Sequence, residues 1–265
     1  MKIIVCADDF GRSQERNKAI DEAFRLGLIK SAGLLVNAKY TQEAVDLALA
    51  GGYIQHLHPH FNIVSGDLSG FSHPLSKKML KNKAFCNNGD FRRHDRASRG
   101  SYANIFLSSV VFDELEQQYL LFQKLTDGKG NDKHIDFHLW NNYRFPVSIA
   151  ISRLIKKYNI LSYRRQGLQH NRGAKKIFRI FSSRLCSNAN CIMNIPSSCV
   201  DWFLHTKEQY SDDVIEAYVH PDYIDGVLMD NTCPVYSKKR FPINDHIDKL
   251  KEAYGSDIIS WIEVK

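Results

Sequence analysis

Acidic and imidazole side chains stand at the ends of several short apolar runs in this sequence. Asp8 and Asp9 follow the first run, His60 lies late in another, and His138 and His220 end two more. One Asp and two His offer three protein ligands for a divalent metal ion and leave an open position for water or substrate. The remaining carboxylate and imidazole are suited to accept and donate a proton. Together these residue types predict a metal-dependent hydrolase site.

Each of these residues also has a structural explanation. Asp-Asp before Phe10-Gly11 is commonly a turn that leads into a helix. His56, His58 and His60 alternate, so they could form the polar face of a half-buried strand. The functional interpretation is favoured because such side chains end four separate predicted strands. The carboxyl ends of parallel strands meet at one face of a barrel, where active sites are built.

The apolar runs alternate with amphipathic stretches, as in a parallel α/β fold. We predict a single domain over 1–265 with a (β/α) barrel-like fold, a distorted or incomplete TIM-type barrel. Residues 66–103 and 166–198 are expected to be loops or insertions, and a doubly wound open sheet is the alternative. The expected strands are 2–7, 33–37, 54–63, 134–138, 160–163, 214–219 and 258–262, and the expected helices are 14–26 and 42–50, capped by Ser13 and Thr41, with 112–125, 147–158 and 244–254.

The composition is that of a globular protein. The 265 residues are 43% hydrophobic and 25% charged, with only 15 Gly and 7 Pro, which excludes wholesale disorder. The longest apolar runs fall far short of the roughly 20 residues of a membrane-spanning helix. The N-terminal run ends in two carboxylates, unlike a signal peptide. The six Cys form no CxxC pair, so we expect free thiols in a cytoplasmic protein.

Positive charge is concentrated in one segment. The net charge is +7, yet residues 137–200 hold eleven Lys or Arg and no Asp or Glu. A second hypothesis is therefore an anion- or nucleic-acid-binding α/β protein that uses this segment. A solvated basic surface is favoured over specific nucleic-acid binding, because no known nucleic-acid motif is present. The residues behind this hypothesis are Arg164, Arg165, Arg172, Lys175, Lys176, Arg179 and Arg184, interleaved with Tyr163, Phe178 and Phe181.

A set of ordered motifs resembles the YdjC-like carbohydrate deacetylases, which include the chitooligosaccharide deacetylases. The resemblance spans nearly the whole chain apart from 70–100 and 166–198, and its most specific part is the opening element followed by correctly ordered His motifs. The motifs are Ala7-Asp8-Asp9-Phe10-Gly11 with Asn17, Gly27 and Asn37, His60-Phe61-Asn62-Ile63 with Gly66, His134-Ile135-Asp136-Phe137-His138 with Pro146, Tyr158 to Arg165, His220-Pro221, and Arg240.

The resemblance implies a barrel-like α/β fold, one divalent metal ion (Mg or Zn) and a hydrolytic reaction. That reaction would remove an acetyl group from an N-acetylated sugar or oligosaccharide. Carried over to this sequence, Asp9, His60 and His138 would hold the metal. Asp8 would be the general base, and His220 would be the general acid that protonates the leaving amine.

Two of the implied assignments leave a choice between neighbouring residues. Arg164 or Arg165 would support the base by charge pairing, and the motif does not decide between them. His58 competes with His60 as a metal ligand, but the spacing from His60 to Gly66 fits the family better.

The sequence departs from the family pattern after the predicted ligand His138. Trp140 and Asn142 replace two further His of that pattern, and an aromatic ring there could stack on a sugar. The expected substrate contacts are Trp140, Asn37 and Phe10. The basic segment would suit an acidic or phosphate-linked sugar, and the family's dimers make a homodimer the default expectation. A deacetylase-like protein without activity is a further alternative, against which the retained Asp and His residues argue.

Overall fold

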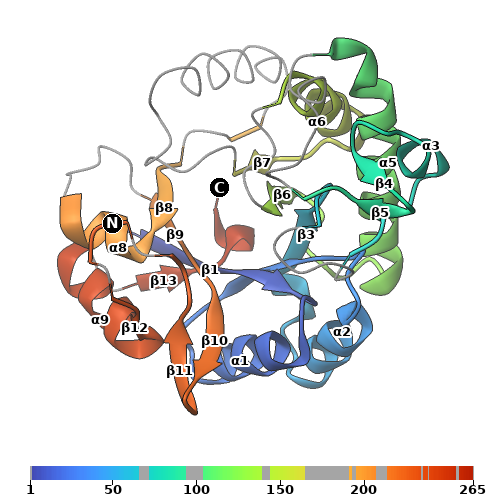
Figure 1. The fold of residues 1–265 in the computed structure, drawn as a ribbon. Helices are drawn as coiled ribbons and strands as arrows, with labels where there is room; N and C mark the ends of the chain where they lie inside the picture. The colour runs from blue at the N-terminus through green and yellow to red at the C-terminus, as the bar shows by residue number, and fades with distance from the viewer. Residues whose placement is uncertain are drawn as a thin grey trace.

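The computed structural model describes residues 2–65, 72–93, 104–138, 144–164, 191–192, 195–206, 214–233, 235–237, 239–254 and 257–264. One curled sheet, in which the pairings are parallel, forms the centre of the molecule, and helices pack around its outside (Figure 1). The expected α/β class is therefore confirmed. The strands of this sheet are β1 (Lys2–Phe10), β2 (Ser31–Leu34), β3 (Leu57–Phe61), β6 (His134–Phe137), β7 (Ser162–Tyr163), β8 (Ser197–Cys199), β9 (Val214–Val219) and β13 (Asp257–Ile259).

The strands follow one another around the curled sheet in chain order. The hydrogen-bonded order is β7-β6-β3-β2-β1-β9-β8, and β13 also pairs with β1. In a doubly wound sheet the chain returns to the neighbour of the first strand and then moves outward. Here the chain runs outward from β1 through β2, β3 and β6 to β7 at one edge, continues at the opposite edge with β8, and then reaches β9 beside β1. Such a path around the sheet in one direction is that of a barrel. The described strands thus form a curled parallel sheet, and closure into a complete TIM-type barrel stays a prediction.

Most helices begin and end close to their predicted positions. Ser13 caps α1 as expected, and Gly27 follows that helix with a φ of +68°, a conformation that favours glycine. Thr41 is not the cap of α2, because Tyr40 holds that position and the Thr41 hydroxyl donates 2.5 Å to the Leu35 carbonyl. The helices are α1 (Gln14–Arg25), α2 (Thr41–Ala50), α3 (Lys77–Leu80), α5 (Ser108–Leu125), α6 (Phe145–Tyr158), α8 (Val200–Thr206) and α9 (Ile243–Tyr254), with short turns η1 (Ile54–His56), η3 (Ile105–Leu107) and η6 (Trp261–Glu263).

The predicted loop regions hold small elements where they are described. Residues 72–93 carry α3 and a two-stranded hairpin, and most of 166–198 lies outside the described residues. An antiparallel sheet that the sequence did not predict follows β9, and the expected last strand gives way to η6 after three residues. The single domain over 1–265 stays a prediction. These smaller strands are β4 (Cys86–Asn87), β5 (Asp90–Phe91), β10 (Pro221–Ile224), β11 (Val227–Asp230) and β12 (Phe241–Pro242).

Side chains of β1 alternate between two environments. Ile3, Val5 and Ala7 pack in the large core cluster that includes residues of α1 and α9. Ile4 and Cys6 lie on the opposite face, in a small cluster with Trp261 of η6. The alternation predicts that Asp8 also faces this inner side, so the first strand delivers a carboxylate to the inside of the curled sheet.

Candidate metal centre and active site

The two adjacent carboxylates can serve one site because the backbone turns at the second of them. On a regular strand Asp8 and Asp9 would point to opposite faces. Asp9 has a φ of 70°, and the pairing of β1 with β2 shifts register between Ala7 and Phe10. A positive φ is uncommon outside glycine and marks local strain of the kind found at functional sites. The turn agrees with the sequence, in which Asp-Asp before Phe10-Gly11 is typical of a turn.

Asp9, His60 and His138 come together from β1, β3 and the end of β6. His138 Nδ1 lies 2.7 Å, and His60 Nε2 3.3 Å, from Asp9 Oδ1, and the three side chains are buried. Gly33 on β2 makes room for this arrangement, because a Cβ there would lie 2.9 Å from His60 Cβ. The three residues predicted as metal ligands therefore present ligand atoms within 4.8 Å of one another.

Burial and charge oppose each other in this cluster. Burial disfavours the ionised form of Asp9, but the charge and the hydrogen bond of His138, with the His60 imidazole also close by, hold the pKa of Asp9 well below its usual value. Burial also disfavours protonation of His60, while Asp136 and Asp9 raise the pKa of His60 to about 10. Without a cation, positive charge on an imidazole thus compensates the carboxylates.

Asp136 on β6 orients His60 by a hydrogen bond to the imidazole nitrogen that does not face Asp9. His60 Nδ1 lies 2.6 Å from Asp136 Oδ1, which leaves Nε2 directed at Asp9. Within the described residues, this buried Nε2 forms no hydrogen bond. A carboxylate that holds one imidazole nitrogen while the other faces a metal is the usual support of a histidine ligand. The donor set and its support therefore fit a divalent cation.

Replacing Asp136 with asparagine is expected to weaken binding of a divalent metal by about 10- to 100-fold. The amide accepts the His60 Nδ1–H less strongly than the carboxylate and leaves the imidazole less firmly oriented. Calorimetric titration of chelator-treated protein measures the change. Asp132→Asn is the matched control, since Asp132 bonds Tyr119 and Gln123 instead. Equal affinity of Asp136→Asn and wild type would contradict the assignment.

Arg164, which follows β7, holds three buried carboxylates. Its Nη2 donates to Asp8 Oδ1 at 2.5 Å and also to Asp136 Oδ2, and its Nη1 lies 3.4 Å from Glu216 Oε1. Such charge-assisted bonds fix geometry as well as compensating charge. Of the two arginines that the sequence left open, Arg164 lies beside Asp8, and Arg165 falls outside the described residues.

Glu216 belongs to this network although the sequence analysis missed it. It lies on β9, and its Oε1 accepts a hydrogen bond from Trp261 Nε1 at 3.1 Å. Burial raises the pKa of Glu216 to about 7; Arg164 opposes the rise, and Asp136 and Asp8 add to it. A signal was present, because Glu216 is the single charged residue in the apolar strand Val214–Val219.

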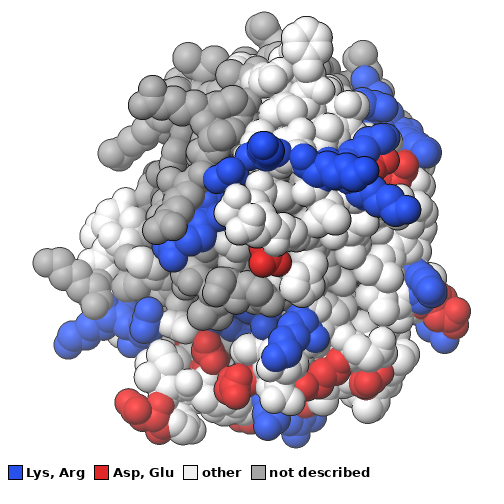
Figure 2. Space-filling model, turned by 45° about the vertical axis from the view of Figure 1, so that its right-hand side comes forward, with Lys and Arg blue, Asp and Glu red and all other residues white. Residues whose placement is uncertain are grey.

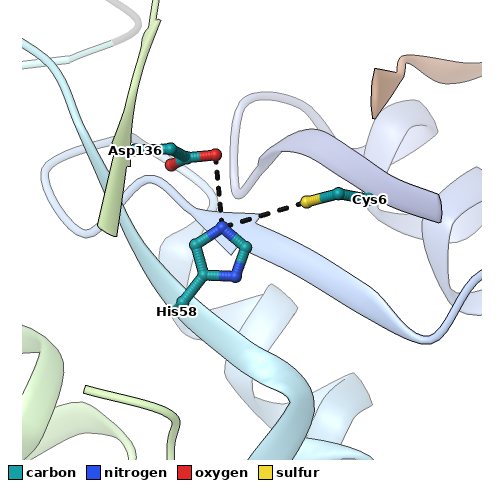
Figure 3. Close-up of side chains that lie close together, drawn as sticks. All are labelled: Cys6, His58 and Asp136. Atoms are coloured by element: carbon teal, nitrogen blue, oxygen red, sulfur yellow. Dashed lines mark hydrogen bonds and ion pairs between the residues drawn. The ribbon is translucent and has the colours of Figure 1, made fainter. Parts of the chain in front are cut away.

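His58, the competing ligand, lies in a second group with Cys6 and Asp136 (Figure 3). Its Nε2 is 3.2 Å from Asp136 Oδ2 and 3.9 Å from Cys6 Sγ. Arg164 already bonds the same Asp136 oxygen, and burial raises the pKa of the Cys6 thiol well above its usual value although Arg164 opposes this. A neutral thiol beside a guanidinium does not favour a second cation. His60 therefore fits the ligand role better than His58.

His220 directly follows β9 and is half-buried. Its Nδ1 lies 2.9 Å from Thr232 Oγ1. Burial lowers the pKa of His220 below its usual value, although the charges of Asp9 and Asp8 oppose this. The resting form near neutral pH is therefore the neutral imidazole, which must take up a proton before it can donate one.

The predicted substrate contacts receive uneven support. The Phe10 ring is fully buried and lies 6.5 Å from the Tyr53 ring in the core, which does not favour contact with a substrate. Asn37 is also buried, and its Nδ2 donates to the Asn62 carbonyl at 3.3 Å. Trp140 lies outside the described residues. The substrate-binding roles of these three residues stay predictions.

Comparison with known proteins agrees with the resemblance found in the sequence. The family described as YdjC-like protein matches residues 2–245. The chain belongs to the YdjC-like family. Relatives of this YdjC-like protein include a carbohydrate deacetylase of Clostridium beijerinckii, 23% identical over the full chain and 96% of the relative. Carbohydrate deacetylase 1 of Listeria innocua is 29% identical over 86% of this chain and 84% of its own length.

A solved structure shares the fold of the YdjC-like chain. It is a crystal structure from Enterococcus faecalis, of a protein described as a candidate for cellobiose-phosphate cleavage. The two chains superpose with a TM-score of 0.69, over 98% of this chain and 97% of the other, at 16% sequence identity. At that identity the likeness shows the fold alone, and it agrees with the curled parallel α/β sheet.

Proposed function

We propose that this YdjC-like protein is a metal-dependent hydrolase that removes the acetyl group from an N-acetylated sugar or oligosaccharide. The observation that carries the proposal is the convergence of Asp9, His60 and His138 near Asp8, which Arg164 holds. The relatives named carbohydrate deacetylase support the substrate class.

Asp9, His60 and His138 would hold one divalent cation. When bound, such a cation supplies a Lewis acid that polarises a carbonyl oxygen and lowers the pKa of a water molecule. Two imidazoles and one carboxylate suit zinc or another transition metal better than magnesium, because magnesium prefers oxygen ligands.

Asp8 and His220 move the protons in this proposal. The Arg164 guanidinium orients Asp8 Oδ1, so that the carboxylate can accept a proton from the attacking water. His220, neutral at rest, takes up a proton and donates it to the nitrogen of the leaving amine. This assignment needs a base that is ionised and an imidazole that can cycle between its two forms near neutral pH.

Acetate release from N-acetylated chitooligosaccharides tests the proposal. Chelator-treated protein is expected to be inactive, to regain activity with added Zn²⁺ or Mg²⁺, and to lose it in His138→Ala. His205→Ala is the matched control, because the exposed His205 stacks on Tyr236. Full metal-dependent activity of His138→Ala would contradict the site.

The acidic or phosphate-linked substrate needs a test of its own. It would be supported if phosphorylated N-acetylated sugars were turned over faster than neutral ones at low salt and if this difference disappeared at high salt.

The hypothesis of an anion- or nucleic-acid-binding protein gains less support. Arg164, one of the residues behind it, is buried against carboxylates and is not available to a surface ligand. Lys and Arg side chains do form a band across one face (Figure 2), and Arg153, Lys156 and Lys157 are exposed on α6. Lys157 pairs with Glu116 at 2.7 Å, as on an ordinary solvated surface. The other arginines and lysines named for this hypothesis lie outside the described residues.

Two further expectations stay predictions. Among the described helices, none combines the length and the apolar character needed to cross a membrane. The cytoplasmic location and the homodimer rest on the cysteine pattern and on the family resemblance.

A further inference from the structure

Hydrogen bonds link His220 through Thr232 to a buried carboxylate, that of Asp230. Thr232 Oγ1 lies 2.9 Å from His220 Nδ1 and 2.5 Å from Asp230 Oδ1. The same oxygen of Asp230 accepts the backbone N–H groups of His220 and Thr232, each at 3.0 Å. Its other oxygen lies 3.2 Å from His246 Nδ1. Asp230, at the end of β11, therefore fixes both the loop and the Thr232 side chain.

The direction of each hydrogen bond follows from the chemistry of the three groups. Burial disfavours ionisation of Asp230, but hydrogen bonds from His246, Thr232 and the backbone hold the pKa of Asp230 below its usual value. An ionised carboxylate accepts only, and a hydroxyl has a single hydrogen to give. The Thr232 hydroxyl must therefore donate to Asp230, and its oxygen is left to accept from His220 Nδ1–H.

We propose that Thr232 and Asp230 position His220 in the tautomer protonated on Nδ1, so that Nε2 is the atom that exchanges protons with the substrate. The inference rests on the proposed function, through the role given to His220. Nε2 takes a proton from solvent and gives it to the leaving nitrogen, while the Nδ1–H bond to Thr232 persists throughout. Asp230 stays ionised and stabilises the imidazolium through the hydroxyl, in the way that a third group orients the base in hydrolase triads.

The arrangement also explains why both residues are needed. Without Asp230, the Thr232 hydroxyl could rotate and donate its hydrogen to Nδ1. The neutral imidazole would then carry its proton on Nε2, and Nε2 would have no free lone pair to take up another proton. The Asp230 carboxylate excludes that alternative because it accepts the hydrogen bond from the Thr232 hydroxyl. Thr232 and Asp230 are positioning residues, since they act only through His220.

Nitrogen-15 NMR of the imidazole rings tests the tautomer without any substrate. In the wild-type protein, at a pH where His220 is neutral, we expect Nδ1 to carry the hydrogen, with the signal assigned by its loss in His220→Gln. Thr232→Val removes the hydroxyl and should move the population toward the Nε2–H form, whereas Thr232→Ser should retain Nδ1–H. Thr206→Val is the control, because the Thr206 hydroxyl donates to the Trp202 carbonyl on α8.

Kinetics of the same variants give the second readout. Thr232→Val is expected to lower kcat by about 10- to 100-fold with little change in KM, since general acid catalysis contributes on the order of 10²- to 10⁴-fold. Thr232→Ser should keep most of the wild-type kcat, and Thr206→Val all of it. An Nε2–H tautomer in the wild type, or an unchanged tautomer in Thr232→Val, overturns the inference. Wild-type protein that releases no acetate but shows the Nδ1–H tautomer would refute the proposed function and leave the positioning intact.

Discussion

Replacement of Asp8 with asparagine is expected to lower kcat for acetate release by about 10²- to 10⁴-fold, the usual contribution of a general base. The amide has nearly the shape of the carboxylate but cannot take a proton from water. Metal affinity should stay near the wild-type value, because Asp9, His60 and His138 are unchanged. Steady-state kinetics at saturating metal measure the first effect, and calorimetric titration with the metal measures the second.

The comparison needs a variant with the same chemical change away from the site. Asp46→Asn on the exposed face of α2 serves this purpose, since Asp46 bonds only Gln42 among the described residues and should leave kcat unchanged. If Asp8→Asn retains the wild-type kcat, Asp8 is not the base. If it instead loses metal affinity in proportion to activity, Asp8 acts as a ligand.

Replacement of Arg164 with methionine is expected to lower the free energy of unfolding by about 3–5 kcal/mol, as when one partner of a buried ion pair is removed. The guanidinium is buried, and it compensates Asp8, Asp136 and Glu216. Methionine fills much of the same volume but leaves three carboxylates without their common cation. Urea unfolding followed by circular dichroism measures the loss.

The pH dependence identifies the cause of that loss. Without the guanidinium, burial raises the pKa of Glu216 further above its unfolded value, and the pKa of Asp136 rises because it loses the largest of the charges that lower it. The penalty is then present at high pH and disappears as pH falls through the raised pKa values, because protonation removes the buried charge. The difference between Arg164→Met and wild type should thus be larger at pH 8 than at pH 5.5. Arg164→Lys should lose less stability, since it keeps one charge. A pH-independent loss would point to packing instead.

The order of the strands and most helices could be predicted because their apolar patterns are long and regular. In the helix Phe145–Tyr158 burial follows the helical periodicity, and in the apolar strand Val214–Val219 every residue after the first is buried. The elements that could not be predicted are short or polar. The strand β8 consists of Ser-Ser-Cys, and the sheet β10-β11-β12 lies among residues with many turn formers, so hydrophobic periodicity carries little information there.

The polar part of the site was predicted where side chains interrupt the end of an apolar run. Asp8, Asp9 and His60 are of this kind. Glu216 was missed because its position depends on which face of β9 turns inward, and one acid in a short strand does not define that face. The turn in Asp8-Asp9-Phe10-Gly11 was predicted, but the left-handed backbone of Asp9 within it was not, because tertiary contacts rather than residue preference set that conformation.

The path of the chain around the sheet in one direction has a consequence for the order in which the molecule can be assembled during synthesis. Strand β1 carries Asp8 and Asp9. It pairs with β9 along one edge, and along its other edge with β13 near its start and with β2 near its end. Strands β9 and β13 are synthesised more than 200 residues after β1. Contacts so distant in sequence form late, because the entropy of closing a long loop comes first. The edge of β1 that pairs with β9, and the part of its other edge that pairs with β13, therefore stay unpaired until almost the whole chain has been synthesised, whereas β2 can pair with the C-terminal half of β1 early.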